Sequence, residues 1–216
     1  MKTRTKALLA VCSLIALMVA TAFGTLAYLT DTDSIANTFT VGNVDIDLYE
    51  YVTDDQGAQV KTDTGKAFED IIPGQTYAKK PVVQVKANSE NAYVRMLLTV
   101  TYLESADNVL ADHNYTAWFD FDNTVWSAPQ LIKTEKADGK ITRVFEARYK
   151  NIVEKPASDT ELAALFTKVS IPGALDNTEL ATLEGFQVDL TANAIQAVGF
   201  ENADAAWFAF NEQVNP

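Results

Sequence analysis

The sequence predicts an all-β protein, an antiparallel β-sandwich with one or two short helices inserted between its strands. Apolar and polar residues alternate over several short stretches, and these stretches are rich in β-branched and aromatic residues. Residues that favour turns separate the stretches. Many short alternating strands around one core are typical of a sandwich.

The first predicted strand, Val44–Tyr51, has an apolar face and an acidic face. Ile46 and Leu48 lie on one side of it, whereas Asp45 and Asp47 lie on the other. A strand with this pattern is half-buried, so we expect the two aspartates to face water.

Two β-hairpins are predicted next. In the first, strands at 82–87 and 92–102 flank a polar turn. In the second, at 131–150, Asp138 and Gly139 supply the tight turn. The longer strand of the first hairpin places five apolar residues on one face, namely Val94, Met96, Leu98, Val100 and Tyr102.

A helix is predicted at 159–169, because Ser158 and Glu161 fit a capping box and apolar residues recur at helical spacing. These apolar residues are Leu162, Leu165, Phe166 and Val169. The remaining predicted elements are two alternating stretches and a short helix or turn, at 117–121, 186–192 and 202–210.

The first 29 residues have the order of a secretory signal, a charged start followed by an apolar run. Lys2, Arg4 and Lys6 precede the unbroken apolar run at 7–29. This run is long enough to span a bilayer, so a permanent membrane anchor is the alternative. Small residues late in the run favour cleavage, with 20–22 as a competing cleavage site. We therefore expect the chain to be exported.

The charge balance limits the partners that the protein can bind. The sequence has 17 basic and 29 acidic residues, and three of the basic ones precede Tyr28, so the chain from Tyr28 onward has a net charge of −15. Nucleic acid and anionic lipid bind clustered cations, and we expect neither as a partner of the mature chain. The single cysteine, Cys12, lies in the apolar run. No internal disulfide is therefore expected after cleavage, and the fold must depend on packing.

His113 and three pairs of aspartates are the candidates for catalysis or metal binding. His113 is the only histidine, so the two-histidine motif of a zinc-protease helix is absent, and we expect a loop residue in solvent. Aspartates two residues apart could bind calcium, but they more often form the solvent-exposed face of a strand. These pairs are Asp31 and Asp33, Asp45 and Asp47, and Asp120 and Asp122. We predict no catalytic, cofactor-binding or metal-binding residue, and no cofactor.

Aromatic residues offer one further candidate, a sugar-binding platform. The alternative is that they fill the core and the edges of the sandwich, where aromatic residues are common. The residues concerned are Tyr49, Tyr51, Trp118, Trp126 and Trp207. We name no ligand site among them.

Several stretches of the chain resemble the TasA/camelysin family. They are 24–31 and 36–48 near the start, 72–75 leading into 88–98, and 194–200 with 205–207. Members of that family are exported by Gram-positive bacteria and processed by a SipW-type signal peptidase. The resemblance therefore implies a jelly-roll-like sandwich and secretion to the extracellular matrix or the cell surface. No motif matches between about residues 103 and 185.

The resemblance also implies a cleavage site and an assembly segment. Cleavage falls after Ala27, with Thr25 two residues earlier and Tyr28 as the first mature residue. The chain then divides into a signal peptide, 1–27, and one sandwich domain, 28–216, which is long enough to bury about 70% of its unfolded surface. The segment after the cleavage site is a candidate donor strand for assembly, or else the first strand of its own domain. Its apolar residues are Leu29, Ile35, Phe39 and Val41.

The predicted function is that of a secreted, non-enzymatic structural protein, a subunit of extracellular matrix (biofilm) or surface fibres. Its expected partners are a SipW-type signal peptidase and further copies of the same chain. It meets the membrane only through the signal peptide before cleavage, and whether an accessory anchoring protein takes part is left open. The first alternative function is that of a camelysin-like secreted or cell-surface metalloprotease, and the second is that of a monomeric surface-binding domain.

Overall fold

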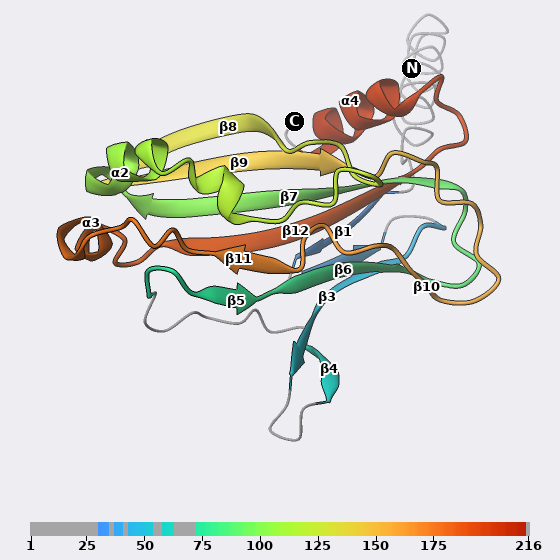
Figure 1. Cartoon of the computed structure of the whole chain (residues 1–216). Coiled ribbons are helices and arrows are strands. Elements are labelled where there is room, and N and C mark those ends of the chain that lie inside the picture. The colour runs from blue at the N-terminus through green and yellow to red at the C-terminus, as the bar shows by residue number, and fades with distance from the viewer. Residues whose placement is uncertain (1–29, 35–36, 41–42, 54–57, 63–71, 215–216) are drawn as a thin grey trace, which may run out of the picture.

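The computed structural model describes residues 30–34, 37–40, 43–53, 58–62 and 72–214, and Figure 1 labels its strands and helices. The strands are β1 (Thr30–Ser34), β2 (Asn37–Thr40), β3 (Ile46–Thr53), β4 (Gln59–Thr62), β5 (Thr76–Ala78), β6 (Lys80–Val85), β7 (Ala92–Leu103), β8 (Gln130–Ala137), β9 (Lys140–Arg148), β10 (Thr160–Glu161), β11 (Lys168–Ser170) and β12 (Gln187–Gln196). The helices are α2 (Asp107–Asp112), α3 (Asn177–Thr182) and α4 (Ala203–Val214), with short 3₁₀ turns at Glu104–Ala106 and Tyr115–Trp118.

The strands form two main antiparallel sheets that lie as two layers (Figure 1). The larger sheet has the order β2-β1-β12-β7-β9-β8, and the smaller one has the order β10-β6-β3-β4. A short antiparallel pair, β11 with β5, lies beside them. The fold is therefore all-β with few helices, as the sequence predicts.

One apolar core lies between the two sheets. The predicted apolar face of β7 is buried, because each of its five side chains is at most 3% exposed. The facing sheet contributes Ile46 and Leu48 from β3, and Val83 and Val85 from β6, to the same cluster. The alternation that is visible in the sequence thus sets which face of each strand enters the core.

The hairpin predicted at 131–150 is confirmed as β8 and β9. Asp138 and Gly139 both adopt positive φ, 52° and 73°, as the tightest hairpin turns require. The strand predicted at 186–192 is also confirmed, and it continues to Gln196 as β12.

The hairpin predicted at 82–102 is wrong, although both of its strands exist. β6 pairs with β3 in the smaller sheet, whereas β7 pairs with β12 and β9 in the larger one. The turn between them, where Asn88 has a φ of 66°, therefore carries the chain from one layer to the other. Alternation predicts a strand, but it does not tell which strand is its partner.

The helix predicted at 159–169 is wrong. Thr160 and Glu161 form the short strand β10 against β6 instead, and the Leu162 N–H donates to the Val83 carbonyl over 2.8 Å. Asp159, inside the apparent capping box, accepts a hydrogen bond from the Ala87 N–H. All four apolar residues at helical spacing are nevertheless buried, because an extended segment between two layers can bury side chains on both of its sides.

The short helix predicted at 202–210 is confirmed as α4. The sequence analysis did not predict α2 or α3, although α3 has a sequence signal: Asp176 and Glu179 form a capping box at its start. The stretch at 117–121 contains a 3₁₀ turn and a single bridge from Phe119 to Val169 rather than a strand. Among the described residues, no helix is long and apolar enough to cross a membrane.

Candidate functional site: an open sheet edge and the pocket beside it

β8 forms an open edge of the six-stranded sheet. It pairs with β9 on one side, and within the described part of the chain no strand lies on its other side. All eight of its residues are exposed, and two of them are large and apolar, Leu131 at 52% and Ile132 at 51%. An edge of this kind presents unpaired backbone N–H and C=O groups with which another chain can pair.

The two halves of β8 differ in character. A register shift lies between Leu131 and Lys133, so Ile132 sits at a β-bulge. Beyond it, Lys133 and Glu135 form an ion pair of 2.8 Å, and Lys136 adds another charge. Lysines and other charged residues are means by which proteins protect an edge strand, so the apolar beginning of β8, which has no charged residue, is its less protected part.

The opposite edge of the same sheet is formed by the N-terminal strands. β1 pairs with β12 from Thr30 opposite Ile195 to Ser34 opposite Thr191, and β2 pairs with β1. Of the predicted donor residues, the backbone of Phe39 lies in β2, opposite Thr32. The other donor residues and the predicted cleavage residues lie outside the described residues: Leu29, Ile35 and Val41, and Thr25, Ala27 and Tyr28.

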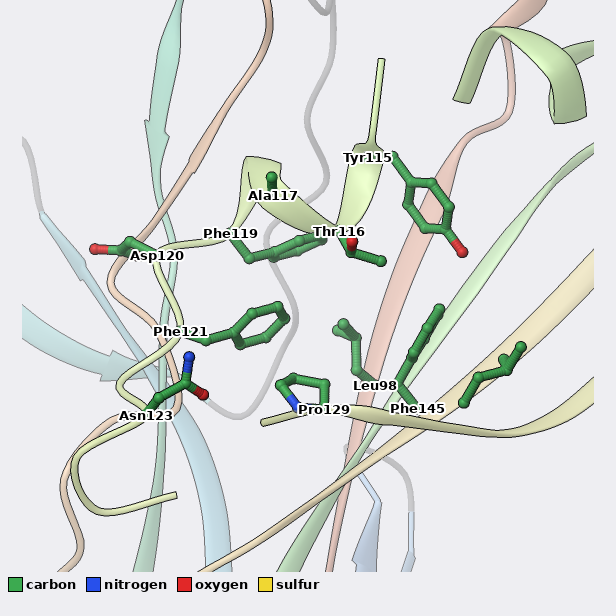
Figure 2. Close-up of a pocket in the computed structure, with 11 residues that line it drawn as sticks. Leu98, Tyr115, Thr116, Ala117, Phe119, Asp120, Phe121, Asn123, Pro129 and Phe145 are labelled. Atoms are coloured by element: carbon green, nitrogen blue, oxygen red, sulfur yellow. The ribbon is translucent and has the colours of Figure 1, made fainter. Parts of the chain in front are cut away.

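A pocket of about 670 Å³ opens beside the beginning of β8 (Figure 2). Its floor is made of side chains that are at most 8% exposed: Leu98, Tyr115, Phe119 and Phe145. The partly buried Phe121 and Pro129 form its wall, and the exposed Leu131 lies at its mouth. The pocket thus combines a buried apolar floor with access from solvent.

Asp120, the lining residue that carries a full charge, does not face this pocket. Figure 2 shows its side chain turned away from the rings of Phe119 and Phe121. Its carboxylate accepts hydrogen bonds from both backbone N–H and side-chain hydroxyl of Thr167 and from the Lys168 N–H, at 2.6 to 2.8 Å. Burial alone would raise the pKa of Asp120, but these hydrogen bonds lower it overall. The carboxylate therefore holds the loop in place.

His113 does not form a metal site with the described residues. Its Nε2 lies 3.3 Å from Glu179 Oε1, a contact that links α2 to α3. The described residues include no group of three or more His, Cys, Asp or Glu that could hold a metal ion. Two of the aspartates weighed as calcium ligands have partners in the protein: Asp47 forms an ion pair with Lys86, and Asp122 accepts hydrogen bonds from the Thr124 N–H and hydroxyl.

The aromatic residues weighed as a sugar-binding platform belong mainly to the core. Trp118, Trp126, Trp207 and Tyr49 are each at most 6% exposed, so they offer no open face to a sugar. Tyr51, the fifth, donates its hydroxyl to Glu161 at the edge of the smaller sheet. The three tryptophans therefore lie in the apolar clusters, as the core alternative predicts.

Arg95 is a buried residue that sequence reasoning missed. It is 4% exposed on the outer face of β7, and its guanidinium lies 4.4 Å from the centre of the Trp207 ring on α4. It donates to Glu146, Asn193 and Asn211 at 2.9, 3.0 and 2.9 Å. An arginine at a predicted solvent-facing strand position gives no hint that a distant helix covers it.

Comparisons of this chain with models of known families, with curated proteins and with solved structures found no match. The function must therefore be argued from the geometry of the fold and the sequence.

Proposed function

We propose that this protein is a secreted, non-enzymatic structural protein of a Gram-positive bacterium, a subunit of extracellular matrix (biofilm) or surface fibres. The observation that supports this proposal best is the open edge at β8, which has exposed apolar residues at its beginning. An apolar stretch on an edge strand is a hazard in a monomer, and it is a means of assembly in a protein built to polymerise.

The two edges of the six-stranded sheet differ, and this difference sets the geometry of assembly. β8 lies at one edge, and the N-terminal strands β1 and β2 lie at the other. A contact between the β8 edge of one copy and the N-terminal strands of the next is heterologous. Such a contact does not close on itself, so repetition produces a filament.

The N-terminal segment from Tyr28 to Val41 is the donor in this proposal. In a monomer, β1 and β2 pair with their own sheet, and in a fibre an extended segment of one copy pairs with the open edge of the next copy. Cleavage after Ala27 by a SipW-type signal peptidase frees this segment from the membrane, so export controls assembly. The jelly-roll-like arrangement of the 28–216 domain and its location outside the cell belong to the same proposal.

Electron microscopy of the mature protein, with and without residues 28–37, tests this proposal. Loss of filaments, with the circular dichroism spectrum of the folded domain retained, supports strand donation. Filaments that persist after the deletion contradict it, and so does a domain that unfolds, because the segment would then be an integral strand. Casein cleavage that both a chelator and His113→Ala abolish would replace the structural function with that of a metalloprotease.

A further inference from the structure

We propose that the pocket beside β8 is a binding site for a small, uncharged ring compound. This inference does not rest on the fibre function, because the pocket lies within one copy of the chain. Its volume of about 670 Å³ lies within the range of roughly 300 to 1,000 Å³ that is typical of small-molecule sites.

The loop that forms one wall of the pocket is held in a fixed position. Asp120 bonds Thr167 and Lys168, as described above, and the Asp122 N–H donates to the Leu165 carbonyl over 2.9 Å. Phe119 forms a backbone bridge to Val169. Because these contacts order the wall before any ligand arrives, little conformational entropy is lost on binding.

Aromatic rings determine the shape of ligand that the pocket accepts. Phe119 and Phe121 are stacked, with ring centres 5.4 Å apart and an angle of 21° between their planes. Phe166 packs edge-on against both rings from the core, at 5.1 and 5.7 Å. Figure 2 shows the Phe121 ring and the Pro129 ring bordering the same space, with Leu98 near them. The rings of Phe121 and Pro129 that border the space favour a flat ring compound as the ligand.

The charges around the pocket determine that the ligand is neutral. Asp120 points away and its two carboxylate oxygens already accept hydrogen bonds, so the lining offers no free full charge to a charged ligand. A charged ligand would lose its water without gaining a partner of opposite sign, which is unfavourable. Among the lining residues, the side-chain amide of Asn123 can bond a polar atom of the ligand. The Thr116 hydroxyl donates to Asn114 Oδ1, so it can only accept a hydrogen bond from the ligand.

Two fluorescent probes that share a ring system test both parts of this proposal. N-phenyl-1-naphthylamine is neutral, and 8-anilino-1-naphthalenesulfonate adds one sulfonate to the same rings. We expect the neutral probe to bind with one site per chain, and the sulfonate to bind about tenfold more weakly or worse. Equal affinities would overturn the assignment of a neutral ligand, and no saturable binding of the neutral probe would overturn the site itself.

Two substitutions locate the probe. Ala117→Trp places a bulky ring among the exposed lining residues, whereas Ala181→Trp places the same ring on an exposed position of α3 away from the pocket. We expect the first to weaken binding of the neutral probe by about tenfold or more, and the second to leave it unchanged. Leu131→Trp, at the mouth, is the second pocket variant in case Ala117→Trp does not fold. Binding that both folded pocket variants leave unchanged would contradict the proposal, because the probe would then sit on another apolar surface.

Discussion

Two regions of the same six-stranded sheet are built in opposite ways. At its centre, the outer face of β7 and β12 is covered by α4, and Arg95 lies between that helix and the strands. At its edge, β8 leaves every residue exposed, and two large apolar side chains have no cover. A closed centre makes the domain stable by itself, whereas an open edge leaves part of the sheet available to a partner.

Removing Arg95 should have the largest effect on stability. Arg95→Ala leaves the Glu146 carboxylate, which is 8% exposed, with its ion pair to the more exposed Arg148 alone, and removes the contact with Trp207. We expect the free energy of unfolding to fall by about 3 kcal/mol, the lower end of the usual cost of breaking a buried ion pair, because Arg148 still neutralises part of the Glu146 charge. Urea denaturation measures this change. Arg143→Ala, which removes a more exposed pair with Asp107, is the control and should cost clearly less.

The two phenylalanines of α4 should respond very differently to truncation. Phe210 is 2% exposed and packs against Trp207, whereas Phe208 is 69% exposed on the same helix. We expect Phe210→Ala to lower the free energy of unfolding by about 3 kcal/mol, and Phe208→Ala to change it by about 0.5 kcal/mol or less. Equal effects in thermal unfolding would show that α4 does not cover the sheet as described.

The stability of the hairpin formed by β8 and β9 should depend on Gly139. Gly139 has a φ of 73°, and a Cβ built there meets no atom within 4 Å, so a side chain is opposed only by the backbone conformation. Gly139→Ala should therefore lower the free energy of unfolding by about 1 kcal/mol. Asp138→Asn is the control, since asparagine tolerates the same positive φ and should be neutral. Chemical denaturation measures the free energy of unfolding of both variants, and equal values for the two would contradict this prediction.

The smallest expected effect lies at the edge of the smaller sheet. The ion pair with Lys61, at 2.8 Å, and the hydroxyl that Tyr51 donates lower the pKa of Glu161 to about 2. Because this folded-state pKa is depressed, its contribution to stability is present above the unfolded value of about 4.3 and is lost as the pH falls toward 2. Solvent screening limits it to about 1 kcal/mol or less. Between pH 4.5 and pH 2, the free energy of unfolding of Glu161→Gln should fall by that much less than it does in the unmodified protein. An equal fall in the two proteins would contradict this prediction.

The comparison between centre and edge also shows what the sequence could reveal. The apolar face of β7 and the turn at Asp138 and Gly139 were predictable, because alternation and turn chemistry are local properties. The layer change at Asn88 was not, because β6 and β7 each find partners far away in the sequence. Helical spacing failed at 159–169 for a related reason: an extended segment between two layers buries residues on both sides.

The candidate site was less predictable than the fold. The predicted processing residues around Ala27 lie outside the described residues, so the processing step stays a prediction. The charged residues of β8 are typical of an edge strand, but they do not tell which sheet the strand borders. The pocket joins residues from 98 to 145 that meet only in the folded chain. The stacked pair at Phe119 and Phe121 was visible as alternation, but its role as a pocket wall was not.

Electron microscopy of an edge variant tests the central claim, that β8 is the surface on which fibres assemble. Ile132→Lys places a charge at the apolar beginning of β8, and Ile152→Lys places the same charge at a similarly exposed apolar residue outside the strands. If the account is right, the mature protein carrying Ile132→Lys remains folded and forms no filaments, whereas the Ile152→Lys protein forms them as the unmodified protein does. Filaments of normal length and number from the folded Ile132→Lys protein would contradict it.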